Sequence, residues 1–336
     1  MVKSSKLRRI IRSKEMLLIL IAIIVIAIFR IVNTYFLSVG SLRGIMQQMS
    51  VTGVMAVGVT CLFIGGGIDL SGTNVCFFAG IIAALLINAG VHWLLAAVIV
   101  VVIGALLGSI NAFMIARLGM MPFIATIALS NVLYGVNLAI TKGQNIPIPH
   151  KEFWWGGVSL FNAIPIPFII LIVLLVLYGF MLSKSQFGRN IYLVGGNQAA
   201  ARLTGVNPVK TRSILYINNG ALSALAGVVL TSRMQTATPQ SQSDSQMTAI
   251  TAAILGGVAF TGGVGGMPGC FIGIVILCFF NSGLISLALD SFWQLIASGV
   301  LLIIALTVDF FNERSRELSL KGRNISALRA KKEGGQ

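Results

Sequence analysis

Residues 184–212 read KSQFGRNIYLVGGNQAAARLTGVNPVKTR and form the longest polar interruption in a chain that is otherwise almost continuously apolar. The stretch divides the apolar runs into two groups, and it carries five basic residues and no acidic ones. Within it, Asn197 can cap a short helix over residues 198–204, which Gly205 can end in a left-handed turn. Because two turns of helix are not stable alone in water, we expect this helix to dock on something. The alternative, a plain basic loop that only fixes membrane topology, stays open.

The composition on both sides of this stretch indicates a membrane protein. The chain has 336 residues, of which 56% are hydrophobic and only 10% are charged, whereas a soluble domain carries about 25% charged residues. Several apolar runs approach the roughly 20 residues that a membrane helix needs, and a β-barrel would show short alternating segments instead. We therefore predict an all-α, polytopic membrane protein.

The net charge of +15 is concentrated where the positive-inside rule would place it, which argues against a nucleic-acid partner. Six Lys and Arg residues precede the first apolar run, seven lie in the tail, five lie in residues 184–212, and Arg117 lies between two runs. This bias predicts that both termini and the central loop face the cytoplasm, and the basic flanks favour anionic lipid. The remaining five basic residues would face the other side: Arg30, Arg43, Lys142, Lys151 and Arg233.

Two termini on the same side require an even number of spans, and we count ten. The expected spans are Met16–Phe36, Ile45–Gly65, Asn74–Asn88, Trp93–Arg117, Phe123–Thr141, Ile164–Leu182, Ser213–Thr231, Thr248–Phe260, Cys270–Leu287 and Phe292–Phe310. The predicted organisation is a basic N-terminus (1–15), a first membrane half of six spans (16–183), the cytoplasmic loop (184–212), a second half of four spans (213–310) and a basic tail (311–336).

Glycine clusters interrupt the apolar runs at residues 65–67 and 256–266. Glycine permits close helix packing and non-helical backbone inside membrane proteins. Because both clusters join a span that reaches the cytoplasmic side to one that leaves it, we expect them to be equivalent places in an internal repeat. The other interpretation is two tight turns with small-residue helix packing.

Few ionisable residues could lie at membrane depth, and Asp69 is the main one. It is either part of an ion pathway or a cap for the helix that follows it. The other polar candidates for a translocation pathway are uncharged amides, which suit hydroxylated neutral solutes. We predict Asp69, Asn74, Asn218 and Asn219 as pathway residues, since the adjacent Asn218 and Asn219 cannot both face lipid.

Motifs for catalysis and energy conversion are missing from the sequence. There is no GxxxxGK[ST] phosphate loop, no HExxH and no GxSxG, so we predict no catalytic residue. The four cysteines lie in or beside apolar spans without CxxC spacing, and we expect no metal site and no cofactor. Transport against a gradient would then require a partner or an ion gradient.

Three segments, in order, carry a family resemblance. They are Gly66-Gly67-Ile68-Asp69-Leu70-Ser71; Gly188-Arg189 with residues 195–206; and Ser232-Arg233, Ala237 and Pro239 with Ala249-Ile250, Leu255-Gly256-Gly257 and Gly262-Gly263-Val264-Gly265. Over about Gly44 to Phe311 the chain resembles the permease subunit of bacterial ABC sugar importers of the ribose, galactose and xylose type.

This resemblance implies a multi-pass protein of the bacterial inner membrane that works with several partners. These are a second permease chain, identical or closely related, two ABC ATP-binding subunits and an extracytoplasmic sugar-binding protein. It also implies that Asn197–Gly205 is a coupling helix seated in a cleft of the ATPase. The coupling residues implied are Gly196, Asn197, Gln198, Ala199, Ala200, Arg202, Leu203, Thr204 and Gly205.

The chain departs from the family pattern at three places, which leave the identity of the solute open. Gln198 stands where Glu is common, residues 240–247 replace glycines and a Glu-Leu pair, and Gly266-Met267 replaces a basic residue. We expect a permease for a monosaccharide or a similar polyhydroxylated solute. The alternatives are an ion-coupled carrier acting alone and a permease of the same superfamily for amino acids or nucleosides. A membrane enzyme is disfavoured, because no nucleophile and base can be paired.

Overall fold

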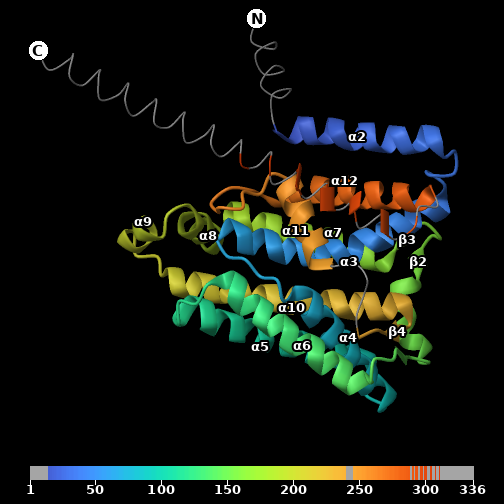
Figure 1. The fold of residues 1–336 in the computed structure, drawn as a ribbon, viewed down its shortest axis with the longest axis horizontal. Helices are drawn as coiled ribbons and strands as arrows, with labels where there is room; N and C mark the ends of the chain where they lie inside the picture. The colour runs from blue at the N-terminus through green and yellow to red at the C-terminus, as the bar shows by residue number, and fades with distance from the viewer. Residues whose placement is uncertain are drawn as a thin grey trace, which may run out of the picture.

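The computed structural model describes residues 14–239 and 245–287, together with scattered positions between 290 and 310. The described chain is almost entirely helical (Figure 1). The helices are α2 (Lys14–Val32), α3 (Val39–Ile64), α4 (Gly72–Asn88), α5 (Trp93–Ala112), α6 (Pro122–Thr141), α7 (Ile166–Lys184), α8 (Gln186–Gly196), α9 (Gln198–Leu203), α10 (Pro208–Met234), α11 (Ser245–Leu255) and α12 (Met267–Ser286). A π-helical turn, η1 (Phe113–Arg117), extends α5, and η2 (Lys151–Gly157) is a 3-10 helix.

The described residues also include four two-residue strands, in two antiparallel pairs. β1 (Ile146–Pro147) pairs with β4 (Thr236–Ala237), with Ile146 opposite Ala237. β2 (Ser159–Leu160) pairs with β3 (Ile164–Pro165). These pairings give local order to the loop between α6 and α7.

The polytopic helical membrane class is confirmed, although a count of ten spans is not. Within the described residues, six helices are long and apolar enough to cross a membrane: α3, α5 with η1, α6, α7, α10 and α12. Shorter apolar helices cover Leu18–Val32, Gly72–Asn88 and Ser245–Leu255. Nine of the expected spans therefore coincide with a helix, and Phe292–Phe310 lies where only scattered residues are described.

The expected span Thr248–Phe260 is wrong as a full crossing. Its helix, α11, has 11 residues and ends at Leu255, a rise of about 16 Å where the hydrocarbon core is about 30 Å thick. The chain then leaves the helix at Gly257, whose φ is +82°. An apolar run cannot reveal this break, because Val258 and Ala259 stay buried beyond the end of the helix.

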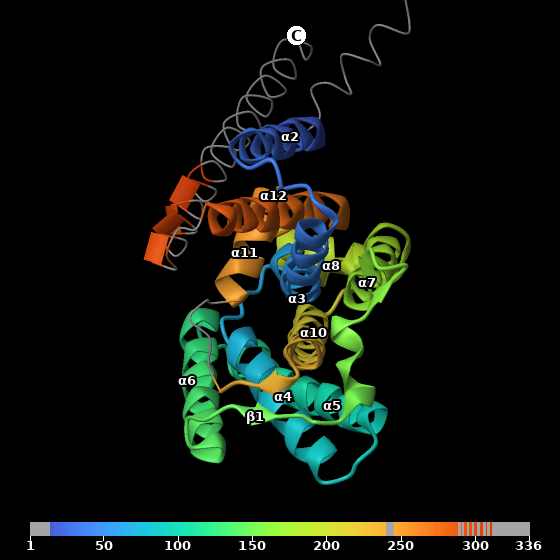
Figure 2. The same cartoon turned by 90° about the vertical axis from the view of Figure 1, so that its right-hand side faces the viewer.

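The long helix α10 lies at the centre of the bundle, between α3 on one side and α4 and α5 on the other (Figure 2). On α3 every residue from Met49 to Ile64 is buried, which is typical of a helix surrounded by others. Close approach of α5 and α10 depends on glycine: a Cβ on Gly220 would lie 2.3 Å from the carbonyl oxygen of Gly104. The bundle thus encloses the polar side chains that α10 carries.

The polar stretch 184–212 forms one end of the bundle, with α8 and α9, and the short strands lie at the other end (Figure 1). Two features of this end differ from expectation. An additional helix, α8, precedes the expected one, and α10 begins at Pro208 rather than at Ser213. The early start of α10 has a local cause, because the Asn207 side chain accepts a hydrogen bond from the backbone of Lys210 and Pro208 suits the first helical turn.

Candidate functional site

Three polar side chains on one face of α10 hold the chain between α3 and α4. Arg212, Tyr216 and Asn219 have the spacing i, i+4, i+7, which places them on one face of a helix. The bonds run from Arg212 Nη2 to the Gly66 carbonyl (3.1 Å), from the Tyr216 hydroxyl to the Ile68 carbonyl (3.1 Å) and from Asn219 Nδ2 to Asp69 Oδ2 (2.9 Å). The first glycine cluster and Asp69 therefore form an extended segment, the first break (residues 65–71), which runs alongside α10.

The end of this break lies inside the helical bundle. Asn219 is 11 residues beyond Pro208, the first residue of α10, so the two are about 17 Å apart along the helix. Non-helical backbone inside a membrane protein is tolerated where it is enclosed by protein, and discontinuous helices commonly form transport sites. Asp69 and Asn219 accordingly mark a polar centre inside the bundle.

Asp69 is 2% exposed, and its carboxylate holds the start of α4. Oδ1 accepts from the backbone N–H of Ser71 (2.8 Å), from the Ser71 hydroxyl (2.6 Å) and from Asn111 Nδ2 on α5 (3.3 Å). Ser71 is the residue that immediately precedes α4, so Asp69 fixes the position of this residue rather than capping a backbone N–H of the first helical turn itself. The same carboxylate also joins α5 and α10 to the break.

Gln246 at the start of α11 closes the polar centre from the second membrane half. Its Nε2 donates to the Asp69 carbonyl (2.7 Å), and its backbone N–H donates to the Thr73 hydroxyl (2.8 Å). Asn111, Asn219 and Gln246 are all buried, so the centre is shut off from solvent in this conformation. A solute would reach it only after the helices move apart.

The structure brings two of the four predicted pathway residues together and separates the others. Asp69 and Asn219 are directly bonded. Asn218 points to the other side of α10, where it accepts from the Tyr178 hydroxyl of α7. Asn74 donates to the Ser130 hydroxyl of α6 at 2.8 Å. Asn74 and Asn218 are partly exposed, unlike Asp69 and Asn219.

The second glycine cluster, residues 256–266, lies against the first break and against α8. The backbone N–H of Gly263 donates to the Ile64 carbonyl (2.8 Å), and the Tyr192 hydroxyl of α8 donates to the Gly265 carbonyl (2.8 Å). Burial, with a smaller contribution from Cys61, raises the pKa of Tyr192. The first break and the second glycine cluster therefore meet at the end of the bundle that carries α8 and α9.

The predicted start and stop of the short helix α9 are confirmed. Asn197 Oδ1 accepts from the backbone N–H of Ala200 (3.0 Å). Gly205 has φ +81° and follows the last turn, and the N–H of Val206 donates to the Ala201 carbonyl (3.0 Å). Ala201 faces inward and is buried, whereas Leu203 is 91% exposed. One face of α9 is thus open, with a large apolar side chain on it.

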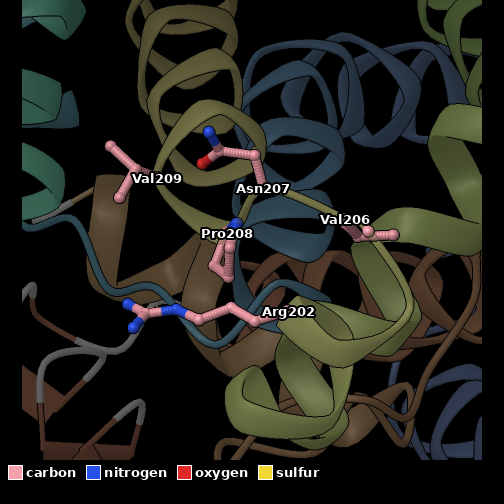
Figure 3. Close-up of a pocket in the computed structure, with 6 residues that line it drawn as sticks. Arg202, Val206, Asn207, Pro208 and Val209 are labelled. Atoms are coloured by element: carbon pink, nitrogen blue, oxygen red, sulfur yellow. The ribbon is translucent and has the colours of Figure 1, made fainter.

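A hollow of about 340 Å³ lies between α9 and the start of α10 (Figure 3). Its walls are Arg202, Gly205, Val206, Asn207, Pro208 and Val209. Figure 3 shows the Arg202 side chain extending from α9 beneath Pro208. Together with the exposed Leu203, this hollow gives the end of the bundle a shaped surface of mixed apolar and basic character.

Comparison with known proteins identifies the family of this chain. Residues 41–306 match the family described as branched-chain amino acid transport system / permease component. The chain belongs to this permease family. The permease is 35% identical over 295 residues to the ribose import permease protein RbsC of Escherichia coli (strain K12), covering 86% of this chain and 92% of the relative.

Other relatives of the permease are similar in extent. The ribose import permease protein RbsC of Bacillus subtilis (strain 168) is 36% identical over 288 residues, covering 85% of this chain and 89% of the relative. The L-arabinose transport system permease protein AraH of Escherichia coli (strain K12) is 30% identical over 276 residues, covering 82% of this chain and 84% of the relative. No solved structure shows significant similarity to the permease.

Sequence reasoning missed several residues of the polar centre. Asp69 and Asn219 were predicted, and Arg212 and Tyr216 could have been found from their helical spacing relative to Asn219. Asn111 and Gln246 carried no such signal, because they lie 42 and 177 residues from Asp69. Within the described part of the permease, no group of three or more His, Cys, Asp or Glu residues could hold a metal ion.

Proposed function

We propose that this permease is the membrane-spanning subunit of an ATP-driven importer for a pentose or a similar polyhydroxylated solute. The observation that carries the proposal is the capped helix α9, which is anchored through Ala201 and offers Leu203 to a partner. A capped two-turn helix with an exposed Leu is unfavourable in water and favourable in a protein cleft. The ribose and L-arabinose permeases among the relatives support the solute class.

The proposed partner at α9 is an ATP-binding subunit, because the sequence holds no phosphate loop of its own. The contact residues proposed are Gly196, Asn197, Gln198, Ala199, Ala200, Arg202, Leu203, Thr204 and Gly205. Ala199, Ala200 and Arg202 are exposed with Leu203, so they form the outer face of the helix. The importer would contain two such permeases, each with one ATP-binding subunit, and an extracytoplasmic binding protein at the opposite end.

The orientation in the bacterial inner membrane follows from charge. The basic stretch 184–212, which contains α8 and α9, would lie in the cytoplasm by the positive-inside rule, as would both termini. The short strands and η2 would then lie on the outer side, where a binding protein delivers its solute. Trp93 and Trp155 support this placement, since their rings pack 6.2 Å apart beside η2 and suit a membrane interface.

The proposed pathway passes the polar centre inside the bundle. Asp69 and Asn219 would be uncovered when the bundle opens, and Asn74 and Asn218 supply further amides around it. Amide groups both donate and accept, so they can replace the water around sugar hydroxyl groups. A weak pathway is sufficient, because the binding protein would supply most of the affinity.

Two alternative functions are less well supported. The family description names branched-chain amino acids, but the relatives quoted above are pentose permeases. An ion-coupled carrier would use Asp69, yet both carboxylate oxygens already accept from neutral donors that join three helices. An ion would have to break these bonds in order to bind.

The test is purification of the tagged permease from its host in mild detergent, with partners identified by mass spectrometry. Recovery of an ATP-binding subunit and a binding protein supports the proposal. Tryptophan fluorescence of that binding protein with D-ribose, L-arabinose, L-leucine and adenosine then identifies the solute class. Recovery of the permease alone in several detergents, with uptake abolished by collapse of the proton gradient, would favour the ion-coupled carrier.

A second variant tests α9 directly. Replacement of Asn197–Thr204 by a Gly/Ser linker should abolish ATP-driven uptake and leave membrane insertion intact, since only Ala201 of this stretch is buried. Normal uptake by the linker variant would disprove the coupling assignment.

A further inference from the structure

The Arg212 side chain connects α9 to the first break. Its Nη2 donates to the Gly66 carbonyl (3.1 Å). The same guanidinium also lies against the side-chain amide of Gln198 in α9, and the Gln198 oxygen accepts from it once the amide is assigned in the orientation that satisfies both groups. Arg212 is half-buried between these groups. One residue therefore touches both the helix that faces the proposed ATPase and the segment that ends at Asp69.

Backbone contacts join the same three segments behind this side chain. Gly195 ends the last full turn of α8, and a Cβ placed there would lie 1.8 Å from the Ile64 carbonyl oxygen and 2.7 Å from the Gly263 nitrogen. Only glycine permits such an approach. No side chains therefore separate the end of α8 from the first break or from the second glycine cluster. A shift of α8 must either displace these two segments or move away from them.

The two kinds of contact differ in what they can transmit. The close contacts at Gly195 are steric, so they transmit a movement of α8 toward the first break but not a movement away from it. The Arg212 guanidinium contacts both Gln198 and Gly66, so it can transmit a displacement of α9 in either direction. Further along the same face of α10, Tyr216 and Asn219 bind the rest of the first break as far as Asp69.

We propose that Arg212 is a positioning residue that carries the displacement of α9 to the first break, and through it to the polar centre at Asp69. This inference rests on the proposed function, because it needs an ATPase that moves α9. It adds a route for that movement: Gln198, Arg212, Gly66 and Asp69. The neutral Gln198 makes this link a hydrogen bond between an amide and a guanidinium, rather than an ion pair.

The experiment is hydrogen–deuterium exchange with mass spectrometry on the permease co-produced with its ATPase, with and without ATP and vanadate. It requires no transported solute. In the unaltered complex, nucleotide should change exchange in residues 197–205 and, by about fivefold or more, in residues 65–71. In Arg212→Met the change at 197–205 should persist and the change at 65–71 should fall to about twofold or less.

Three further variants separate loss of the link from general damage. Gln198→Ala breaks the link from α9 and leaves Arg212 on Gly66, so it should reproduce the effect of Arg212→Met, and the double variant should add nothing. Lys210→Met removes the same charge from an exposed position of the same helix and should behave like the unaltered complex. Gln198→Glu combined with Arg212→Lys restores a bonded pair and should recover the response at 65–71.

The outcomes are distinguishable. A nucleotide response at 65–71 that persists in both Arg212→Met and Gln198→Ala overturns the inference, as does its absence from the unaltered complex. Loss of the response in Lys210→Met as well would show a general charge effect and also overturns it. If no ATPase assembles with the permease, the proposed function fails and the inference falls with it.

Discussion

Asn219 donates a hydrogen bond from Nδ2 to Oδ2 of Asp69 at 2.9 Å, although the two residues are 150 positions apart in the chain. Both are buried, and they join the central helix α10 to the break between α3 and α4. This bond makes the first and second membrane halves depend on each other. It also places the one carboxylate of the polar centre among neutral donors, with consequences that can be measured.

Asp69→Asn should destabilise the permease. The new amide replaces an acceptor by a donor among Ser71, Asn111 and Asn219, all of which donate to the carboxylate. We expect a loss of about 1–3 kcal/mol in the free energy of unfolding, seen as a lower melting temperature in detergent. Uptake should fall only in proportion to the folded protein.

Asp290→Asn is the matched control for this change, because it removes the same charge at an exposed position. Unchanged stability of Asp69→Asn together with complete loss of uptake would contradict the structural role and support ion coupling.

Adjacent glycines at the end of α8 should respond differently to the same change. Gly195→Ala places a methyl group 1.8 Å from the Ile64 carbonyl oxygen, whereas at Gly196 nothing lies within 4 Å. Overpacking of this kind costs about 1–3 kcal/mol. We therefore expect a lower melting temperature for Gly195→Ala and little change for Gly196→Ala. Equal stability of the two variants would show that α8 does not pack on the break in this way.

Asn197→Ala should weaken α9 without disturbing the bundle. The cap bond from Ala200 N–H to Asn197 Oδ1 is lost, at a cost of about 1 kcal/mol, or about fivefold in the helix–coil equilibrium. We expect lower ATP-driven uptake at an unchanged melting temperature. Asn197→Ser, which keeps an oxygen acceptor, should retain most of the uptake; a loss as large as that of Asn197→Ala would argue that the amide has another role.

Leu203→Glu should prevent assembly with the ATP-binding subunit. The side chain is 91% exposed in the permease alone, so a charge there should leave folding intact, but it would be buried in the complex. Interface residues of this kind contribute about 2 kcal/mol, roughly thirtyfold in affinity. Co-purification measures the effect, and Leu203→Met, which keeps the apolar volume, should assemble normally. Full assembly of Leu203→Glu would mean that the partner binds elsewhere.

Local features of the sequence were sufficient for the membrane class and for α9. Apolar runs of about 20 residues have few alternatives to membrane helices, and the Asn197 cap and the Gly205 turn depend only on neighbouring residues. The positive-inside pattern also predicts an orientation, which stays a prediction. The family resemblance drawn from motif order is confirmed by the match over residues 41–306.

Other features could not be read from neighbouring residues. The apolar run Thr248–Phe260 looks like a span, but burial among other helices allows it to leave the helix after Leu255. Helix α8 was not expected, because its glycines and polar residues obscured two local signals, the Ser185 cap and the buried Ile191 and Val194. It is held by contact of Gly195 with Ile64 and Gly263.

The sequence by itself determined that this chain is a helical membrane permease with a capped helix in its central polar stretch, because hydropathy, charge bias and capping act over short distances. Only the tertiary structure decided that Asp69, Asn111, Asn219 and Gln246 form one buried centre. A buried polar group must be satisfied by whatever donor the packing brings to it, and this partner can come from any distance along the chain.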